Sequence, residues 1–385
     1  MRVAVFGGSY NPPHEGHIRA ANAALEQLKP DLFLLMPTSR SPDKDPQKSD
    51  PGVHERLELV KLAAEKIPGS SVSDTEIKRG GNSYTADTVD ELKMMYPGAE
   101  IILLAGADVF LNIETWYMAE KLLGGVSIAV FERSPVKADQ VRAHGEYLSG
   151  KYKTKLYYVN NEPFEADSTG LRDKLKERGG NEFLTDNVYS YIIKNRLYGA
   201  KPNFEWLREK AYAMLAPQRT AHVQGCEEEA IKLAERWGED ADKAAEAAIL
   251  HDITKKLTPE EQVSLCEKYG VSYDDAELRY PKLLHPKTGA ALARDLFGAG
   301  DEVCGAVLWH TTGRREMTVL EKILYLADYI EYNRSFEGLD KLRYLAYKDM
   351  DAAMRLGLEI SLDALKESGT EPHRNSKEAL KWFSR

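Results

Sequence analysis

Five short apolar runs alternate with helix-like segments over the first half of the chain, and this alternation constrains the fold more than any other feature. The apolar runs are 2–6, 31–36, 100–105, 126–131 and 155–159. Between them, segments such as 54–66 and 85–95 place apolar residues at helical spacing. Alternation of this kind predicts a Rossmann-like α/β fold, in which helices cover both faces of a parallel sheet and ligands bind at the carboxyl ends of the strands.

The pattern changes after the segment NRLYGAKPNF, residues 195–204. From residue 205 to 380, nearly every segment is typical of a helix, and Gly, Pro and Asp turns separate the helices. A chain of 385 residues is also long for a single hydrophobic core. We therefore predict an α/β domain over residues 1–198, a linker at 199–203 and an all-helical domain over 204–385.

Composition and charge narrow the function classes. No apolar stretch approaches the roughly 20 residues that span a bilayer, and no basic region leads an apolar signal, so we expect a cytoplasmic protein without a membrane partner. The net charge of −9 disfavours a general nucleic-acid surface but is compatible with small phosphorylated substrates. Cys226, Cys266 and Cys304 lack C-x-x-C spacing, which favours reduced, buried thiols over disulfides or a cysteine zinc site.

The segment GGSYNPPHEGH, residues 7–17, directly follows the first apolar run. Gly7 and Gly8 let the backbone approach a phosphate closely, and the helix that begins after this loop points its N–H groups and positive dipole end at an anion. His14 and His17 are three residues apart, so both rings can face one ligand. The segment predicts a phosphate site, with a pair of solvated turn histidines as the alternative.

This segment resembles the G-G-(S/T)-(F/Y)-(D/N)-P-x-H-x-G-H motif of the nucleotidyltransferase superfamily, whose members join a nucleotide to a phosphorylated partner and release pyrophosphate. Three further segments are similar, in the same order, to bacterial nicotinate-nucleotide adenylyltransferases: NSYTADTVDEL at 82–92, GADVFLNIETW at 106–116 and DSTGLRDKL at 167–175. The resemblance covers about residues 1–198. It implies adenylyl transfer from ATP, with Mg²⁺, to nicotinate mononucleotide, which gives deamido-NAD and pyrophosphate.

The resemblance also implies which residues bind each substrate. For ATP they are Gly7, Gly8, Ser9, His14, His17, Ser168, Thr169 and Arg172. For nicotinate mononucleotide they are Lys44, Thr85, Asp108 and Trp116, with the indole stacking on the pyridine ring. The attacking 5'-phosphate is already an anion at pH 7, so His14, His17 and Arg172 would catalyse by positioning and charge stabilisation. Lys44 and Arg56 are further candidates for phosphate contacts, with an ordinary charged surface loop as the alternative. An ordinary helix cap with a surface arginine is the alternative for the 167–175 segment.

The helical half contains five of the nine histidines, at positions 222, 251, 285, 310 and 373. In AILHDITKKL, the adjacent His251 and Asp252 suit a divalent metal, with a solvated His beside a capping Asp as the alternative. Polar groups among apolar residues are costly unless they are paired or ligated. Four more such groups are His222, His285, His310 and Asp328. Six groups exceed what one ion takes, so we predict two ions sharing a bridging carboxylate, with iron, manganese or zinc favoured over magnesium.

The order H…HD…H…H…D resembles the HD metal-dependent phosphohydrolase superfamily. The segments AAILHDITKKL, LLHPKTGA, WHTTGRREMTVLEKILYLADYIEYNR and LDKLRYLAYKDMDAA are similar to its YqeK-type members, which are symmetrical diadenosine tetraphosphate hydrolases with a di-iron centre. The resemblance spans about residues 204–370 and implies cleavage to two ADP, with Asp252 as a catalytic residue. The metal ligands that it implies are His222, His251, Asp252, His285, His310 and Asp328. Candidate phosphate contacts beside them are Arg219, Thr254, Lys255 and Thr311, with local structural roles as an equal alternative. His373 is expected at the surface.

Two alternatives remain for the helical domain. It could hydrolyse another nucleotide, such as a deoxynucleoside triphosphate or a cyclic dinucleotide, or it could sense nucleotides without catalysis. Six ligand-type residues argue against a pure sensor, because a scaffold has no need to bury them. The main prediction is a bifunctional enzyme whose partners are ATP, nicotinate mononucleotide and diadenosine tetraphosphate, and a homo-oligomer is compatible with the sequence.

Overall fold

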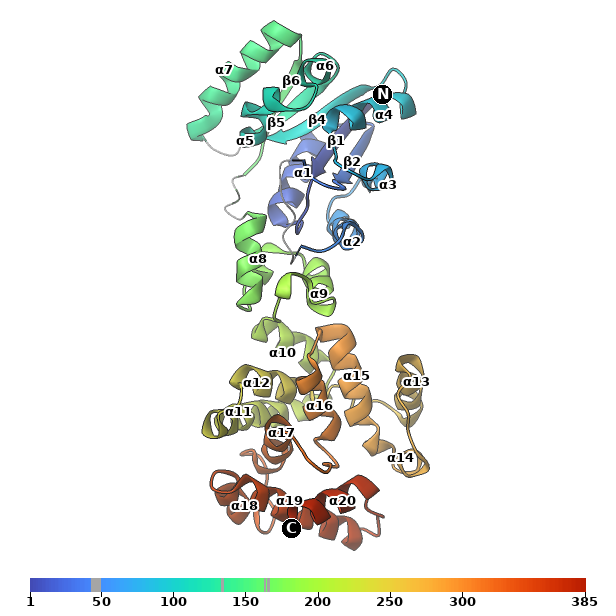
Figure 1. Ribbon diagram of the computed structural model, residues 1–385, viewed down its shortest axis with the longest axis vertical. Helices are drawn as coiled ribbons and strands as arrows, with labels where there is room; N and C mark the ends of the chain where they lie inside the picture. Colours follow the sequence, from blue (N-terminus) through green and yellow to red (C-terminus); the bar gives the residue numbers. More distant parts are fainter. Residues whose placement is uncertain (43–49, 133–134, 163, 165–166) are drawn as a thin grey trace. The chain divides into compact units, whose positions relative to one another are not determined.

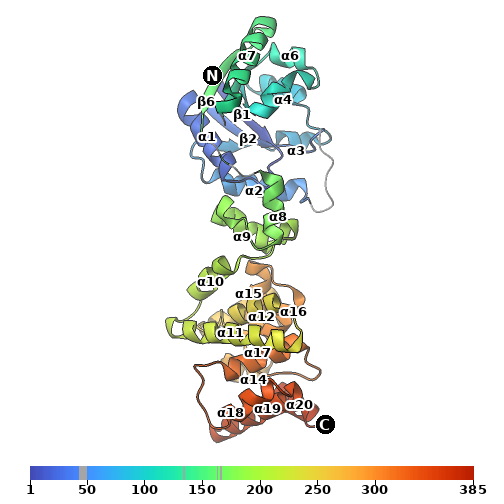
Figure 2. The ribbon, with the colours of Figure 1, turned by 90° about the vertical axis from the view of Figure 1, so that its left-hand side faces the viewer.

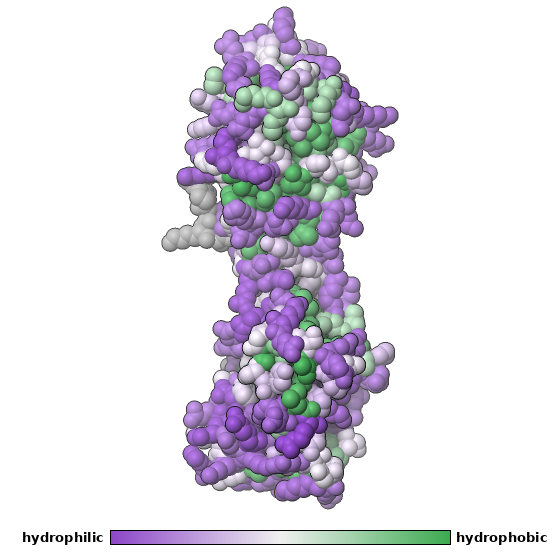
Figure 3. All heavy atoms as spheres, turned by 90° about the vertical axis from the view of Figure 1, so that its right-hand side faces the viewer, coloured by the Kyte–Doolittle hydropathy of each residue, from purple (hydrophilic) through white to green (hydrophobic). Residues whose placement is uncertain are grey.

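The computed structural model describes residues 1–42, 50–132, 135–162, 164 and 167–385. The chain divides into two compact units, Met1–Lys201 and Pro202–Arg385 (Figures 1 and 2). This division falls inside the expected linker, and the exact domain limits at 198 and 204 stay a prediction. Hydrophilic side chains cover most of the face drawn in Figure 3, in keeping with a chain of 29% charged residues. Among the described helices, none is both long enough and apolar enough to span a bilayer.

A six-stranded parallel sheet forms the centre of unit 1, with the strand order β3-β2-β1-β4-β5-β6. The strands are β1 Arg2–Gly8, β2 Leu32–Pro37, β3 Ser70–Val72, β4 Glu100–Gly106, β5 Ser127–Glu132 and β6 Lys155–Asn160. The chain reverses its winding direction between β1 and β4. In an open parallel sheet, such a reversal leaves a crevice at the carboxyl ends of the two strands, where ligands bind.

The helices that lie around this sheet are α1 Glu15–Leu28, α2 Val53–Ala64, α3 Thr75–Arg79, α4 Thr85–Met95, α5 Ala107–Leu111, α6 Ala119–Leu123 and α7 Pro135–Tyr152 (Figure 1). Two further helices of unit 1, α8 Ser168–Lys176 and α9 Asp186–Lys194, lie apart from the strands. The core consists of strand residues such as Val3, Val5, Leu103, Ile128 and Val130, all buried. Burial on both faces explains why the strands read as continuous apolar runs rather than as alternating ones.

Unit 2 is helical, and no strand occurs in its residues 202–385, all of which the structure describes. Its helices are α10 Phe204–Ala213, α11 Thr220–Trp237, α12 Ala241–Leu250, α13 Pro259–Tyr269, α14 Asp275–Arg279, α15 His285–Phe297, α16 Asp301–Trp309, α17 Val319–Ile330, α18 Leu339–Ala346, α19 Met350–Glu367 and α20 Arg374–Phe383. Helix α17 packs against α11, α12, α16 and α19, which explains why it is apolar on nearly every side. The three cysteines are buried, as expected.

The expectation that His373 lies at the surface is wrong. His373 is only 7% exposed and is the N-cap of α20, where its Nδ1 accepts a hydrogen bond from the backbone N–H of Asn375. Its Nε2 lies 3.3 Å from Oδ2 of Asp274. Contacts from elements distant in sequence bury this ring, and such contacts leave no local pattern in the chain.

Candidate active sites

His14 and His17 are positioned by the first turn of α1, at the carboxyl end of β1. His14 is the N-cap, and its Nδ1 accepts from the N–H of Gly16 at 3.2 Å. Nδ1 of His17 accepts from the N–H of His14, also at 3.2 Å. Because an accepting nitrogen carries no proton, the neutral form of each ring has its proton on Nε2. The capping geometry therefore makes Nε2–H the donor of both rings, whose centroids lie 3.9 Å apart.

A cavity of about 910 Å³ opens at the carboxyl ends of β1 and β4, where the sheet reverses direction. Among the residues expected to bind substrates, those in its wall are Gly7, Gly8, Ser9, His17, Thr85, Asp108 and Trp116. A Cβ added to Gly7 would meet one described atom within 4 Å, the carbonyl oxygen of Met36 at 4.0 Å. A side chain at this position would occupy cavity space rather than clash with the protein, which fits a glycine kept for close approach of a ligand.

Two tyrosines in the cavity wall were not singled out as site residues from the sequence. Tyr84 and Tyr117 have ring centroids 4.7 Å apart, and Tyr117 is 54% exposed. Tyr84 lies inside the adenylyltransferase-like segment 82–92, and Tyr117 directly follows the segment 106–116, so these positions were the signal that could have found them. Together with Trp116 they give this part of the cavity several aromatic faces, which suits a planar heterocycle.

Asp167, rather than Ser168 or Thr169, caps helix α8. Its carboxylate accepts from the backbone N–H groups of Thr169 at 2.8 Å and Gly170 at 2.9 Å. These bonds, from Gly170 first and Thr169 second, lower the pKa of Asp167. Two N–H groups at the N-terminus of α8 are thus already bound by Asp167. The side chains of Ser168 and Thr169 do not cap this helix.

The side chains of Ser168 and Arg172 nevertheless lie beside the histidine loop. The Ser168 hydroxyl donates to the carbonyl oxygen of Pro12 at 3.2 Å, and the Arg172 guanidinium donates to that of Asn11 at 2.8 Å. Arg172 also donates to Oγ1 of Thr169 at 3.2 Å. Helix α8 and the histidine loop are far apart in the sequence, and these bonds join them into one site.

Arg56 has a structural role that the sequence did not reveal. It is 7% exposed, and its guanidinium donates to the carbonyl oxygens of Ser9 at 2.8 Å, Thr38 at 2.7 Å and Ser39 at 2.8 Å. Burial lowers its pKa. In place of the expected phosphate contact, Arg56 joins the loops after β1 and β2 through these three hydrogen bonds. Lys44, the other cationic candidate, lies outside the described residues.

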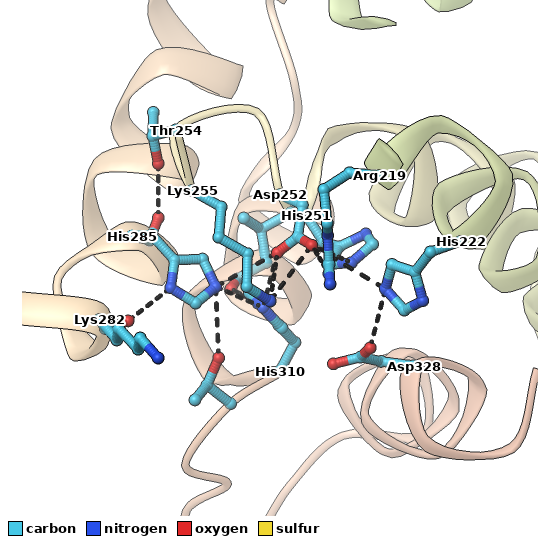
Figure 4. A network of polar contacts seen from close by, with 12 residues as sticks. Arg219, His222, His251, Asp252, Thr254, Lys255, Lys282, His285, His310 and Asp328 are labelled. Atoms are coloured by element: carbon cyan, nitrogen blue, oxygen red, sulfur yellow. Dashed lines mark hydrogen bonds and ion pairs between the residues drawn. The ribbon is translucent and has the colours of Figure 1, made fainter. Parts of the chain in front are cut away.

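In unit 2, six side chains from five parts of the helical fold converge on one buried cluster (Figure 4). They are His222 of α11, His251 and Asp252 after α12, His285 at the start of α15, His310 after α16 and Asp328 of α17. These are the six residues expected as metal ligands. Two triads in this cluster, His222–His251–Asp328 and His251–Asp252–His310, keep their ligand atoms within 4.8 Å of one another.

The histidine rings of this cluster are oriented through their Nδ1 atoms. Nδ1 of His251 donates to the carbonyl oxygen of Ala248, and Nδ1 of His310 donates to that of Val307, both at 2.7 Å. Nδ1 of His285 likewise contacts the Lys282 carbonyl oxygen. A carbonyl can only accept, so Nδ1 carries the proton and Nε2 turns a lone pair toward the cluster, as a metal ligand requires.

The Asp252 carboxylate lies between two groups of imidazole nitrogens. Its Oδ2 is 3.3 Å from Nε2 of His251 and 3.9 Å from Nε2 of His222. Its Oδ1 is 3.3 Å from Nε2 of His285 and 3.7 Å from Nε2 of His310. Asp328 completes the first group, with Oδ1 3.0 Å from Nε2 of His222. Asp252 therefore faces both groups of imidazole nitrogens, as the shared ligand expected from the sequence would.

Unsatisfied polar atoms in the cluster fit a bound metal. Nε2 of His222, Nε2 of His251 and Oδ1 of Asp252 are buried and make no well-aligned hydrogen bond to any residue that the structure describes. Nε2 of His222 and Oδ1 of Asp252 have charged groups within ion-pair distance only, in Asp328 and Lys255. Leaving a buried polar group unsatisfied costs about 1–3 kcal/mol. Four imidazoles and two carboxylates make a nitrogen-rich donor set, which suits iron, manganese or zinc better than magnesium. The residues present thus fit the implied metals.

The ionisation states of these side chains favour the same use. Burial raises the pKa of Asp252, but interactions with His251, His285 and His310 outweigh it and hold this pKa well below its usual range. Burial lowers the pKa of His285 to about 4, and the pKa of His310 also lies below its usual value. At neutral pH the carboxylate is therefore ionised and these two imidazoles are neutral, which are the forms that bind metals.

Cationic side chains surround the two carboxylates. The Arg219 guanidinium contacts the carboxylate of Asp252, and Lys255 Nζ lies 3.1 Å from its Oδ1. Arg334, which was not singled out from the sequence, contacts Asp328 in the same way, although it ends the LADYIEYNR part of a quoted segment.

The two candidate threonines differ in their positions. Thr254 is fully buried and donates to the carbonyl oxygen of His285 at 2.9 Å, which is a structural role in place of the expected phosphate contact. Thr311 Oγ1 lies 3.5 Å from Nε2 of His285, at the cluster itself.

Comparison with known proteins finds a family model for each half of the chain. A cytidylyltransferase-like family model matches residues 5–173, and an HD domain model matches residues 219–333. A probable nicotinate-nucleotide adenylyltransferase of Carboxydothermus hydrogenoformans is 33% identical over 198 residues, which are 51% of this chain and 98% of that protein. A probable nicotinate-nucleotide adenylyltransferase/Ap4A hydrolase of Mycoplasma genitalium is 27% identical over 379 residues, 95% of this chain and 99% of that protein.

One solved structure matches the chain over a shorter length. It is a predicted HD superfamily hydrolase involved in NAD metabolism from Clostridium acetobutylicum, 33% identical, with a TM-score of 0.47, and the match covers 48% of this chain and 98% of that one. The two family models, in the order in which they match, confirm the expected fold classes: a nucleotidyltransferase α/β unit followed by a helical HD unit.

Proposed function

The chain belongs to the nicotinate-nucleotide adenylyltransferase family and carries an HD domain in its second half, and on this basis we propose that it is a bifunctional enzyme. Unit 1 transfers the adenylyl group of ATP to nicotinate mononucleotide, which gives deamido-NAD and pyrophosphate. Unit 2 hydrolyses diadenosine tetraphosphate symmetrically to two ADP. The end-to-end match to a relative named for both activities carries the proposal, and both clusters of expected side chains support it.

In unit 1, the 5'-phosphate of nicotinate mononucleotide attacks the α-phosphorus of ATP, and pyrophosphate leaves on the opposite side. His14 and His17 donate Nε2–H to phosphate oxygens, and Arg172 adds positive charge from α8. Mg²⁺ accompanying ATP adds further positive charge when bound. No side chain has to accept a proton, because the attacking phosphate is already ionised, so catalysis is positioning and charge stabilisation.

Gly7, Gly8, Ser9, Ser168 and Thr169 complete the ATP site in this proposal. The acceptor nucleotide lies in the part of the cavity lined by Thr85, Asp108 and Trp116, with the pyridine ring on the indole face, and Lys44 is a further contact.

In unit 2, the six clustered residues hold two ions, with iron favoured over manganese and zinc. Bound metal supplies positive charge to phosphate oxygens and activates water for attack near the centre of the tetraphosphate. Asp252 is proposed as catalytic because its two oxygens face both halves of the cluster. Arg219 and Lys255, which are partly exposed beside it, provide charge for the polyphosphate.

We place this enzyme in the cytoplasm. Reduced thiols persist in that compartment, and Cys226, Cys266 and Cys304 are buried thiols rather than disulfides in the structure.

A histidine substitution tests the first activity. His17→Ala removes one of the two ring donors, and we expect pyrophosphate release from ATP and nicotinate mononucleotide to fall about 100-fold or more. His54→Ala is the matched control, because His54 is an exposed histidine of α2. Full activity of a folded His17→Ala variant would refute the assignment of unit 1.

A further inference from the structure

His222 differs from the other three histidines of the metal cluster in what holds its outer nitrogen. Nδ1 of His251, His285 and His310 contacts the carbonyl oxygen of the residue three positions earlier. Nδ1 of His222 instead lies 3.1 Å from Oε1 of Glu331, a carboxylate that is 1% exposed. A carboxylate partner makes an imidazole a more basic ligand than a carbonyl partner does.

Glu331 is itself firmly held. Its Oε2 accepts from the backbone N–H of Asn333 at 2.6 Å and from Nδ2 of the same residue at 2.9 Å. Nδ2 of Asn333 also donates to the carbonyl oxygen of Ala221, next to His222. Glu331 directly follows α17, the helix that carries Asp328, so one segment places a carboxylate on each nitrogen of the His222 ring.

Gly225 of α11 makes room for this contact. A Cβ at this position would lie 2.4 Å from Oε2 of Glu331 and 3.1 Å from Cε1 of Tyr332, so no larger residue fits without displacing the carboxylate. Glycine inside a helix costs roughly 0.5–1 kcal/mol relative to alanine. Gly225 lies one turn after His222, and the close approach of Glu331 explains why a glycine occupies this helical position.

We propose that Glu331 is a positioning residue that makes the ion position at His222 and Asp328 the tighter of the two. The other position, on the His285 and His310 side, has imidazoles oriented by carbonyl oxygens only. The inference rests on the proposed two-ion site of unit 2. It adds a difference in metal affinity between the two positions, which the six ligands alone do not predict.

Metal retention under chelator competition tests the proposal in the full-length protein. Glu331→Gln keeps the side-chain shape and removes the charge, and we expect its more tightly held ion to leave at a chelator concentration about 10–100 times lower than in wild type. Elemental analysis counts the ions per chain. Glu277→Gln is the matched control, because Glu277 is a buried carboxylate of the same unit that pairs with Lys287.

Gly225→Ala is the second variant, and it displaces Glu331 without altering its chemistry. We expect it to weaken retention of the same ion, and the double variant to lose no more than Glu331→Gln alone, because both changes act through one contact. The metal-free forms of Glu331→Gln and Glu277→Gln should unfold alike.

Two results would overturn the inference while leaving the two-ion site in place. One is wild-type retention of both ions by Glu331→Gln, and the other is an equal loss from Glu277→Gln. A wild-type protein that binds no metal would instead overturn the two-ion site together with this inference.

Discussion

At the scale of single residues, the site in unit 1 depends on which atom of each side chain faces the ligand. The cap of α1 uses Nδ1 of both His14 and His17, so the chemistry of each ring is carried by Nε2. The sequence predicted the pair and its position after β1. It did not predict the roles of the two nitrogens, because they depend on the hydrogen bonds of the folded turn.

Trp116 provides a prediction at this scale. Replacing it with Ala removes a stacking face worth about 1 kcal/mol, so the KM for nicotinate mononucleotide should rise roughly fivefold, with kcat little changed. Trp116→Phe retains an aromatic face and should lie between the two. Steady-state rates at saturating ATP measure the effect. A fall in kcat at unchanged KM would contradict a stacking role.

Arg56 separates a structural from a substrate-binding role. Arg56→Lys keeps the positive charge but cannot reach Ser9, Thr38 and Ser39 together, so we expect a loss of about 2–3 kcal/mol in the free energy of unfolding of unit 1. Denaturant unfolding of the full chain, monitored by hydrogen exchange of the backbone amides of unit 1, measures the change. A variant of wild-type stability with a raised KM for ATP would restore the phosphate contact expected from the sequence.

At the scale of elements, the spacing of apolar residues predicted the strands and helices that bury apolar side chains. Five of the six strands and helix α4 lie where the apolar runs indicated. Strand β3 was missed because its three residues, Ser70–Val72, include two serines and carry no period. The cap of α8 was placed one residue too late, although Asp167 is a residue type that commonly caps helices and its bonds are local. The burial of His373 was missed because it depends on tertiary contacts, including the one with Asp274, that sequence spacing does not encode.

The α8 cap leads to a prediction at this scale. Asp167→Ala removes the acceptor for two N–H groups, which costs about 1 kcal/mol of helix stability. Because α8 carries Ser168 and Arg172, we expect a higher KM for ATP and an unchanged KM for nicotinate mononucleotide. Asp167→Asn, which can still cap the helix, should behave nearly as wild type. An equal rise in both KM values would contradict this division of the cavity.

At the scale of the whole molecule, each unit contains a complete cluster of its own. The residues assigned to adenylyl transfer all belong to Met1–Lys201, and the six metal ligands all belong to Pro202–Arg385. Sequence spacing alone could not show that histidines 88 residues apart, His222 and His310, would meet in one cluster. The apolar surroundings of these polar residues suggested it, and the superfamily resemblance agreed with it.

Metal removal tests this separation. After chelation and return to magnesium alone, adenylyl transfer should proceed at the wild-type rate, whereas diadenosine tetraphosphate hydrolysis should be lost. Unit 2 should also unfold at a lower temperature, because unsatisfied buried ligand atoms remain. Readdition of iron or manganese should restore both properties. Hydrolysis that persists at full rate without these metals would contradict the metal assignment.

The central claim is that one chain has both activities. Hydrolysis by unit 2 is the activity that most needs a direct test. Metal-loaded protein is incubated with diadenosine tetraphosphate, and the nucleotide products are resolved beside a His251→Ala, Asp252→Ala control. The account predicts ADP as the sole product and no product from the control. AMP together with ATP would contradict symmetrical cleavage, and no turnover by the metal-loaded chain would contradict the bifunctional assignment.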